Sequence, residues 1–166
     1  MTNAIQELLD KRALDELVYG CMNAVDALDW KTYRGLLLDD AEFDITDHGV
    51  APDETAEIIK GADQLLSVVK SVLTGFEAVQ HHVTNMVHRV DGDEATTNAY
   101  VYAEHFLNND RGDRSVTCGG RYKITSRRTQ DGWKVASWQL RISWFRGNPM
   151  LYKLAAEAVI RAAGAK

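Results

Sequence analysis

A change of hydrophobic period near Gly75 is the feature that most limits how this chain can fold. Before Gly75, apolar residues recur every three or four positions, which is the pattern of amphipathic helices with one buried face. After Gly75, apolar and polar residues alternate, which is the pattern of β-strands. The sequence therefore predicts helices first and a sheet second, the arrangement of an α+β domain.

The helical half predicts three helices and a short strand. An apolar stripe that begins at Ile5 predicts a helix over 5–28, and Asp29 can cap a shorter helix after it. A short strand is predicted over 41–47, a polar loop over 48–56, and then a third helix. Gly75 follows that helix where a left-handed cap is most common.

The second half predicts four long strands, at about 77–90, 95–107, 115–128 and 133–145. The connections at 91–93 and 130–132 have the glycine-containing sequences of tight hairpin turns. These strands can all be antiparallel neighbours, so we expect a curved antiparallel sheet that wraps around the N-terminal helices. Such a sheet leaves a pocket between its concave face and the helices. A last helix is predicted after Pro149.

Composition narrows the class of protein without naming an activity. The 166 residues suit a single domain spanning 1–166. The 19 Lys and Arg against 24 scattered Asp and Glu provide no basic stripe for nucleic acid. No apolar run approaches the roughly 20 residues that cross a bilayer, and the start of the chain does not resemble a signal peptide. We expect a soluble, cytoplasmic protein that binds neither nucleic acid nor membranes.

Alternation along the strands predicts which side chains face the pocket. The second long strand carries small residues on the face that includes its histidine, and small residues leave room for a ligand. The predicted pocket face carries His81, Val83, Asn85, Val101, Ala103, His105 and Tyr122.

The opposite face of the sheet also carries large apolar groups, among them Tyr100, Tyr102 and Phe106. In the fourth strand, alternation places Trp138 and Trp144 together on one face, so both faces of the sheet carry large apolar groups. A single layer of helices can cover only one face, so the other face predicts a homo-oligomer.

Asp26, near the end of the first helix, and His81 are the candidate acid/base pair, since such a dyad needs neither metal nor cofactor. Each residue alone has an ordinary structural explanation, as an ion-paired carboxylate and a hydrogen-bonded core histidine. His81, His105 and Asp26 could also form a triad of two histidines and one carboxylate for a metal. That alternative is disfavoured, and we expect no metal and no cofactor.

Four segments together resemble the SnoaL-like branch of the nuclear-transport-factor-two-like (cystatin-like) superfamily. They are residues 23–30, 81–85, 90–95 and 131–135, within a resemblance that covers roughly residues 5–147. It implies a cone-shaped α+β barrel. The chain resembles in particular the scytalone dehydratase and hexachlorocyclohexane dehydrochlorinase group. The catalytic aspartate and histidine of that group match Asp26 and His81, and a second histidine of the dehydratase falls at His105.

The chain also departs from the dehydratase. Two tyrosines that hold its leaving group fall on Val25 and Ile45, and its serine and asparagine fall near Gly120 and Tyr122. The dehydratase substrate therefore does not carry over, although Val25, Ile45 and Tyr122 remain candidate substrate contacts.

The resemblance implies a cofactor-independent lyase or isomerase acting on a small, mostly apolar alicyclic, steroid-like or polyketide-like molecule. His81 would be the general base, oriented by Asp26, while His105 or Tyr122 would serve the leaving group. The alternative is a non-catalytic ligand-binding module, like the β subunits of ring-hydroxylating dioxygenases. Among oligomers, the resemblance favours a trimer over a dimer.

Overall fold

The computed structural model of the chain describes residues 2–46 and 58–164, and the predicted loop over 48–56 lies outside them. The elements follow one another as α1 (Thr2–Asp26), α2 (Trp30–Gly35), β1 (Leu37–Thr46), β2 (Ile59–Lys60), α3 (Ala62–Leu73), β3 (Ala78–Asp91), β4 (Glu94–Phe106), β5 (Ser115–Thr129), β6 (Gly132–Gly147) and α4 (Met150–Gly164). The predicted order of helices and strands is confirmed, and the two-residue strand β2 is the one element of this order that was not predicted.

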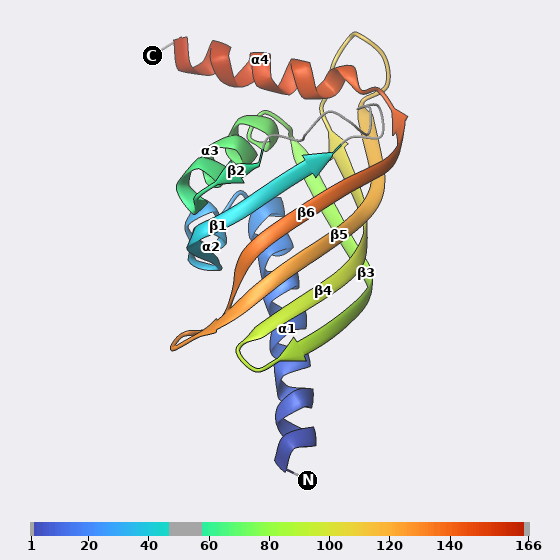
Figure 1. Cartoon of the computed structure of the whole chain (residues 1–166). Helices are drawn as coiled ribbons and strands as arrows, with labels where there is room; N and C mark the ends of the chain where they lie inside the picture. The colour runs from blue at the N-terminus through green and yellow to red at the C-terminus, as the bar shows by residue number, and fades with distance from the viewer. Residues whose placement is uncertain (1, 47–57, 165–166) are drawn as a thin grey trace.

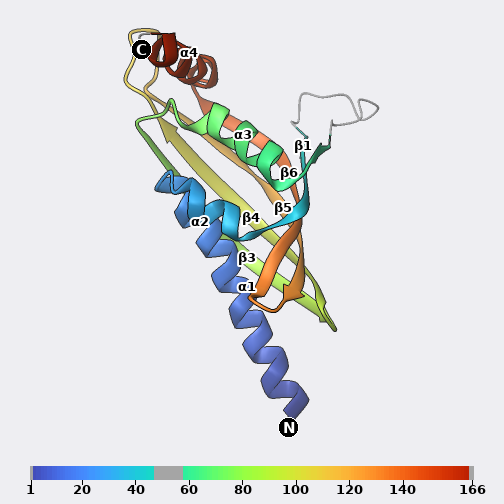
Figure 2. The same cartoon turned by 90° about the vertical axis from the view of Figure 1, so that its left-hand side faces the viewer.

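The described strands form one curved, unclosed sheet in the order β2-β1-β6-β5-β4-β3. Strands β3 to β6 are an antiparallel meander, as the hairpin turns predicted, and β1 pairs in parallel with β6. Helices α1, α2 and α3 lie against one face of the sheet, and α4 lies across one end (Figures 1 and 2). No helix in the described part of the chain is long and apolar enough to span a membrane.

Helix α1 supplies one side of the core and then continues past the sheet. Its buried face includes Leu14, Val18 and Val25, whereas Ile5 and Leu8 are largely exposed. The predicted apolar stripe is therefore buried only in the later turns, because the N-terminal end of α1 projects beyond the sheet (Figure 1).

A partly buried ion pair attaches α1 to the β5–β6 hairpin. Both carboxylate oxygens of Asp10 accept hydrogen bonds from the Arg128 guanidinium, at 2.7 and 2.9 Å. The guanidinium also lies over the Trp133 ring, 4.3 Å from its centroid. The hydrogen bonds from Arg128 lower the pKa of Asp10 to about 2, although burial acts in the opposite direction.

Irregularities in β3 and β6 place parts of these two strands on the opposite face of the sheet from the one predicted. A bulge between Thr84 and Val87, where Asn85 has φ of 55°, shifts the alternation by one residue. His88 consequently turns inward, where it hydrogen-bonds Asp15 of α1 at 2.9 Å. A similar shift in β6 leaves Trp144 on the outer face, 44% exposed, while Phe145 turns inward.

Gly75 also has a different role from the one predicted. Its φ is not positive, and α3 ends instead on Thr74 in a right-handed conformation. A Cβ at position 75 would collide with the backbone of Ala155 in α4. Glycine is needed here because α4 packs directly on the segment between α3 and β3.

Candidate active site

The Asp26 carboxylate holds His81 at the ring and at the backbone. Oδ1 of Asp26 lies 2.6 Å from Nδ1 of the His81 ring, and Oδ2 accepts the backbone N–H of His81 at 2.9 Å. Both contacts involve the same histidine, so the carboxylate restricts the rotation of its ring. The two side chains are only 10% and 22% exposed for His81 and Asp26, respectively.

The position of Asp26 does not stabilise α1, so its contact with His81 has another role. It is the last residue of α1, where the partial negative charge of the helix end disfavours a carboxylate. As an acceptor, the ionised carboxylate requires the proton of a neutral His81 ring on Nδ1, which leaves the lone pair of Nε2 available. If Nε2 takes up a proton, Asp26 and the C-terminal end of α1 both stabilise the resulting imidazolium.

His81 lines an apolar cavity of about 300 Å³ between the sheet and the helices. That volume is at the lower end of ligand pockets, which typically measure about 300–1,000 Å³. Besides the histidines, the wall is formed by aliphatic and aromatic side chains and by a few hydroxyl and thiol groups. The lining residues are Met22, Val25, Tyr33, Phe43, Val68, Val69, Val72, Leu73, His81, Val101, Ala103, His105, Cys118, Tyr122, Trp138, Leu140, Ile142, Phe145 and Tyr152.

His105 lies beside His81 in the cavity wall. Their ring centroids are 5.8 Å apart and their planes nearly perpendicular. Burial lowers the pKa of His105 to about 4, and positive charge on His81 also lowers it. A hydrogen bond with the Val116 backbone and the negative charge of Asp26 raise this pKa, but by less. His105 is therefore neutral near pH 7, and a neutral imidazole can donate one hydrogen bond and accept another.

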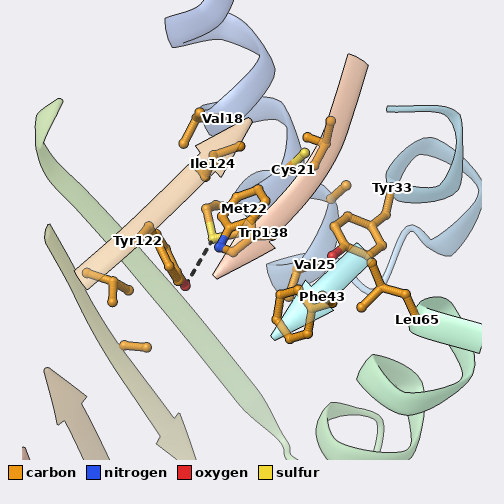
Figure 3. Close-up of a cluster of buried hydrophobic side chains, with 14 of the residues drawn as sticks. Val18, Cys21, Met22, Val25, Tyr33, Phe43, Leu65, Tyr122, Ile124 and Trp138 are labelled. Atoms are coloured by element: carbon orange, nitrogen blue, oxygen red, sulfur yellow. Dashed lines mark hydrogen bonds between the residues drawn. The ribbon is translucent and has the colours of Figure 1, made fainter. Parts of the chain in front are cut away.

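Tyr122 contributes a buried hydroxyl from β5. The hydroxyl donates to the sulfur of Met22 at 3.9 Å, and the ring packs edge-on against Trp138 with centroids 4.9 Å apart (Figure 3). Burial raises the pKa of Tyr122 well above its ordinary value. The hydroxyl therefore stays protonated and can act only as a neutral hydrogen-bonding group.

The structure brings most of the predicted site residues together. Val25, Val101 and Ala103 line the cavity with the two histidines, and Asp26 lies behind His81. Val83 packs against the core from the same sheet without lining the cavity. Ile45 is in β1, paired with Leu140, but its side chain lies outside the described residues.

Asn85 is the correction among the predicted contacts. It is exposed and lies with Tyr100 and Arg121 in a polar depression on the outer face. The bulge at this residue reverses the predicted alternation, which placed it in the cavity.

Part of the cavity wall comes from residues that the sequence pattern did not indicate as pocket residues. Val69 and Leu73 of α3, Phe145 of β6 and Tyr152 of α4 all reach it. The apolar periodicity of α3 indicated a buried face, but periodicity alone does not say which part of a core surrounds a cavity. Within residues 2–46 and 58–164, no three His, Cys, Asp or Glu side chains are grouped to hold a metal ion.

A family model for the SnoaL-like domain matches residues 6–139, so the chain belongs to the SnoaL-like family. A comparison of sequences with curated proteins gives no match.

Solved structures show the same fold. A proposed scytalone dehydratase from Novosphingobium aromaticivorans DSM 12444 is 22% identical with a TM-score of 0.73, covering 89% of this chain and 92% of its own. The LinA-type3 hexachlorocyclohexane dehydrochlorinase from Novosphingobium barchaimii LL02 is 20% identical with a TM-score of 0.71, covering 88% and 94%. An NTF2-like protein with a cystatin-like fold from Novosphingobium aromaticivorans is 18% identical with a TM-score of 0.67, covering 85% and 86%. The fold expected from the sequence is confirmed.

Proposed function

We propose that this protein is a cofactor-independent lyase of the dehydratase type, acting on a small, mostly apolar cyclic molecule. The observation that carries the proposal is the Asp26 carboxylate bonded to both His81 Nδ1 and the His81 backbone, behind an apolar cavity. This arrangement directs the basic nitrogen of His81 away from the carboxylate. The names of two structural neighbours, a dehydratase and a dehydrochlorinase, both describe eliminations and support the same class of reaction.

In the proposed reaction, Nε2 of His81 removes a proton from a carbon next to a carbonyl or opposite a leaving group. The electron pair of the C–H bond becomes the new double bond, and the leaving group departs with the electron pair of its own bond. Asp26 stabilises the imidazolium, which then gives its proton to the departing atom and restores the dyad. Without a leaving group, return of the proton to another carbon would make the same site an isomerase.

The largely aliphatic and aromatic wall favours alicyclic, steroid-like or polyketide-like substrates that are small enough for about 300 Å³. A panel of cyclic β-hydroxyketones, scytalone and chlorinated cyclohexanes tests the reaction class. We expect at least one compound to lose water or chloride, followed by enone absorbance or chloride release. Binding of these compounds without elimination, and without exchange of the α-proton in D₂O, would instead favour the non-catalytic binding module.

We further propose a homo-oligomer, with a trimer favoured over a dimer. Tyr100, Phe106 and Trp144 are 46%, 38% and 44% exposed on the outer face of the sheet. Tyr102 joins them there, with its ring 6.0 Å from that of Trp144. Burial of this aromatic surface against other copies would remove apolar area from water.

Light scattering should show an oligomer at micromolar concentration, and Trp144→Glu should shift it toward the monomer. Ile160→Glu, at a 71% exposed position of α4, is the matched control and should leave the oligomer intact. A wild-type monomer at micromolar concentration would remove the basis for this proposal.

A further inference from the structure

Tyr152 links the C-terminal helix to the catalytic face of the sheet. Its hydroxyl oxygen lies 3.3 Å from Nδ1 of His105. Helix α4 lies across the end of the sheet (Figure 1), and the buried residues Leu151, Leu154 and Ala155 hold it there. Tyr152 thus reaches the cavity from an element that contributes neither member of the Asp26–His81 pair.

Aromatic neighbours restrict the orientation of the two rings. The Phe76 ring lies 5.0 Å from the His105 ring and 5.5 Å from the Tyr152 ring, between centroids. The His105 and Tyr152 rings are themselves 5.1 Å apart in an edge-on arrangement. A phenol held in this way presents its hydroxyl to one nitrogen of His105 and not to the other.

The hydrogen bond has two possible directions, and they give His105 different chemical roles. If the hydroxyl donates to Nδ1, the neutral ring carries its proton on Nε2. If Nδ1 donates to the hydroxyl oxygen, Nε2 has a lone pair and the cavity has a second base in place of a donor. Between neutral groups, a phenol is the better donor and an imidazole nitrogen the better acceptor.

We propose that Tyr152 is a positioning residue, whose hydroxyl donates to Nδ1 of His105 and keeps the proton of that ring on Nε2. With Nδ1 accepting from Tyr152, the Nε2–H of His105 serves both the Val116 backbone, with which the ring is hydrogen-bonded, and the leaving group, while His81 acts as the base. This second step rests on the proposed function, whereas the tautomer of His105 does not. The departing atom takes the electron pair of its bond and then the proton held by His81, so His105 loses no proton in the cycle.

The division of roles agrees with the separation of the two histidines. His81 has its Nδ1 on Asp26 and His105 has its Nδ1 near Tyr152, so a carboxylate orients one ring and a phenol the other. Their ring centroids are 5.8 Å apart, so one small molecule can contact both rings.

The tautomer is measured without any substrate, on the full-length protein with ¹⁵N-labelled histidine. Long-range ¹H–¹⁵N spectra at pH 7 should show His105 with its proton on Nε2, with the His105 signals assigned by their loss in His105→Leu. Tyr152→Phe should shift both His105 nitrogens toward a mixture of tautomers. The ring of Tyr152 remains in this variant, so its packing on Phe76 is retained. A proton on Nδ1 in the wild type, or unchanged His105 shifts in Tyr152→Phe, would overturn the proposal.

The catalytic step has a separate test on a compound that the wild type converts. Tyr152→Phe should lower kcat about tenfold with little change in KM, less than the 10²–10⁴ typical of a complete acid/base group. The loss should be larger for a poor leaving group than for a good one, and it should vanish when His105 is already leucine. Tyr19→Phe, which removes an exposed hydroxyl of α1, is the control. An equal loss with and without His105 would contradict the positioning role, while failure of the wild type to convert any compound would count against the proposed function alone.

Discussion

Replacing His81 with alanine should lower kcat/KM for the elimination by on the order of 10²–10⁴, because the variant lacks the general base that Asp26 orients. Asp26→Asn should remove most of the activity as well. The amide oxygen can accept only one of the two hydrogen bonds that the carboxylate accepts. If it accepts the His81 backbone N–H, the amide nitrogen faces Nδ1 and donates to it, which favours the opposite tautomer of the ring. Steady-state kinetics on a compound that the wild type converts would measure both losses.

The double variant Asp26→Asn, His81→Ala should be little worse than either single variant, since residues that act as a unit have non-additive effects. His82→Ala is the matched control, because this neighbouring histidine is on the outer face, with its ring 6.1 Å from that of Tyr102. The wild-type rate should also fall in acid, where a protonated ring cannot accept a proton. Full turnover by His81→Ala would end the proposed mechanism.

The order of elements could be predicted because each depends on local pattern. The four long strands lie within two residues of their predicted ends, since their alternation is strong and glycine turns separate them. Asp29 could be recognised as a cap for the same reason, and its Oδ1 accepts the Thr32 backbone N–H at 3.0 Å.

The faces of individual residues were harder to predict, because one extra residue in a strand reverses every later position. Asn85 and Trp144 show this directly, since each follows or occupies an irregularity that no turn residue announces. Gly75 shows a related limit. Its lack of a side chain serves a contact with Ala155, some 80 residues later, which local pattern cannot reveal.

The residues of the candidate site show the same difference between local sequence pattern and tertiary packing. Asp26 and His81 could be selected because a family motif marks both, and their contact follows from how α1 crosses β3. Tyr152 could not be selected, because the alternation and periodicity of the chain do not say where a C-terminal helix docks. Its contact with His105 depends on tertiary packing of α4 alone.

The second large effect concerns pH and stability, and it arises from His105. An unfolded chain protonates this histidine near its ordinary pKa of 6.5, whereas burial lowers the pKa in the folded protein to about 4. Between these values the unfolded state binds more protons, so the free energy of unfolding falls as the pH falls. At roughly 1.4 kcal/mol for each pH unit, the loss between pH 7 and pH 4 should be about 3 kcal/mol.

Denaturant unfolding of wild type and His105→Leu at several pH values would measure this contribution. The variant is expected to have a different stability at every pH, so the informative quantity is the change in unfolding free energy from pH 7 to pH 4. That change should be about 3 kcal/mol smaller in His105→Leu than in the wild type, while His82→Leu should follow the wild type. Asp10 does not interfere, because both proteins contain it and because its pKa, lowered from 3.8 to about 2, makes most of its stabilisation disappear below pH 4. Parallel pH profiles for wild type and His105→Leu would show that His105 is protonated as readily in the folded protein as in the unfolded chain, and that the cavity is open to water.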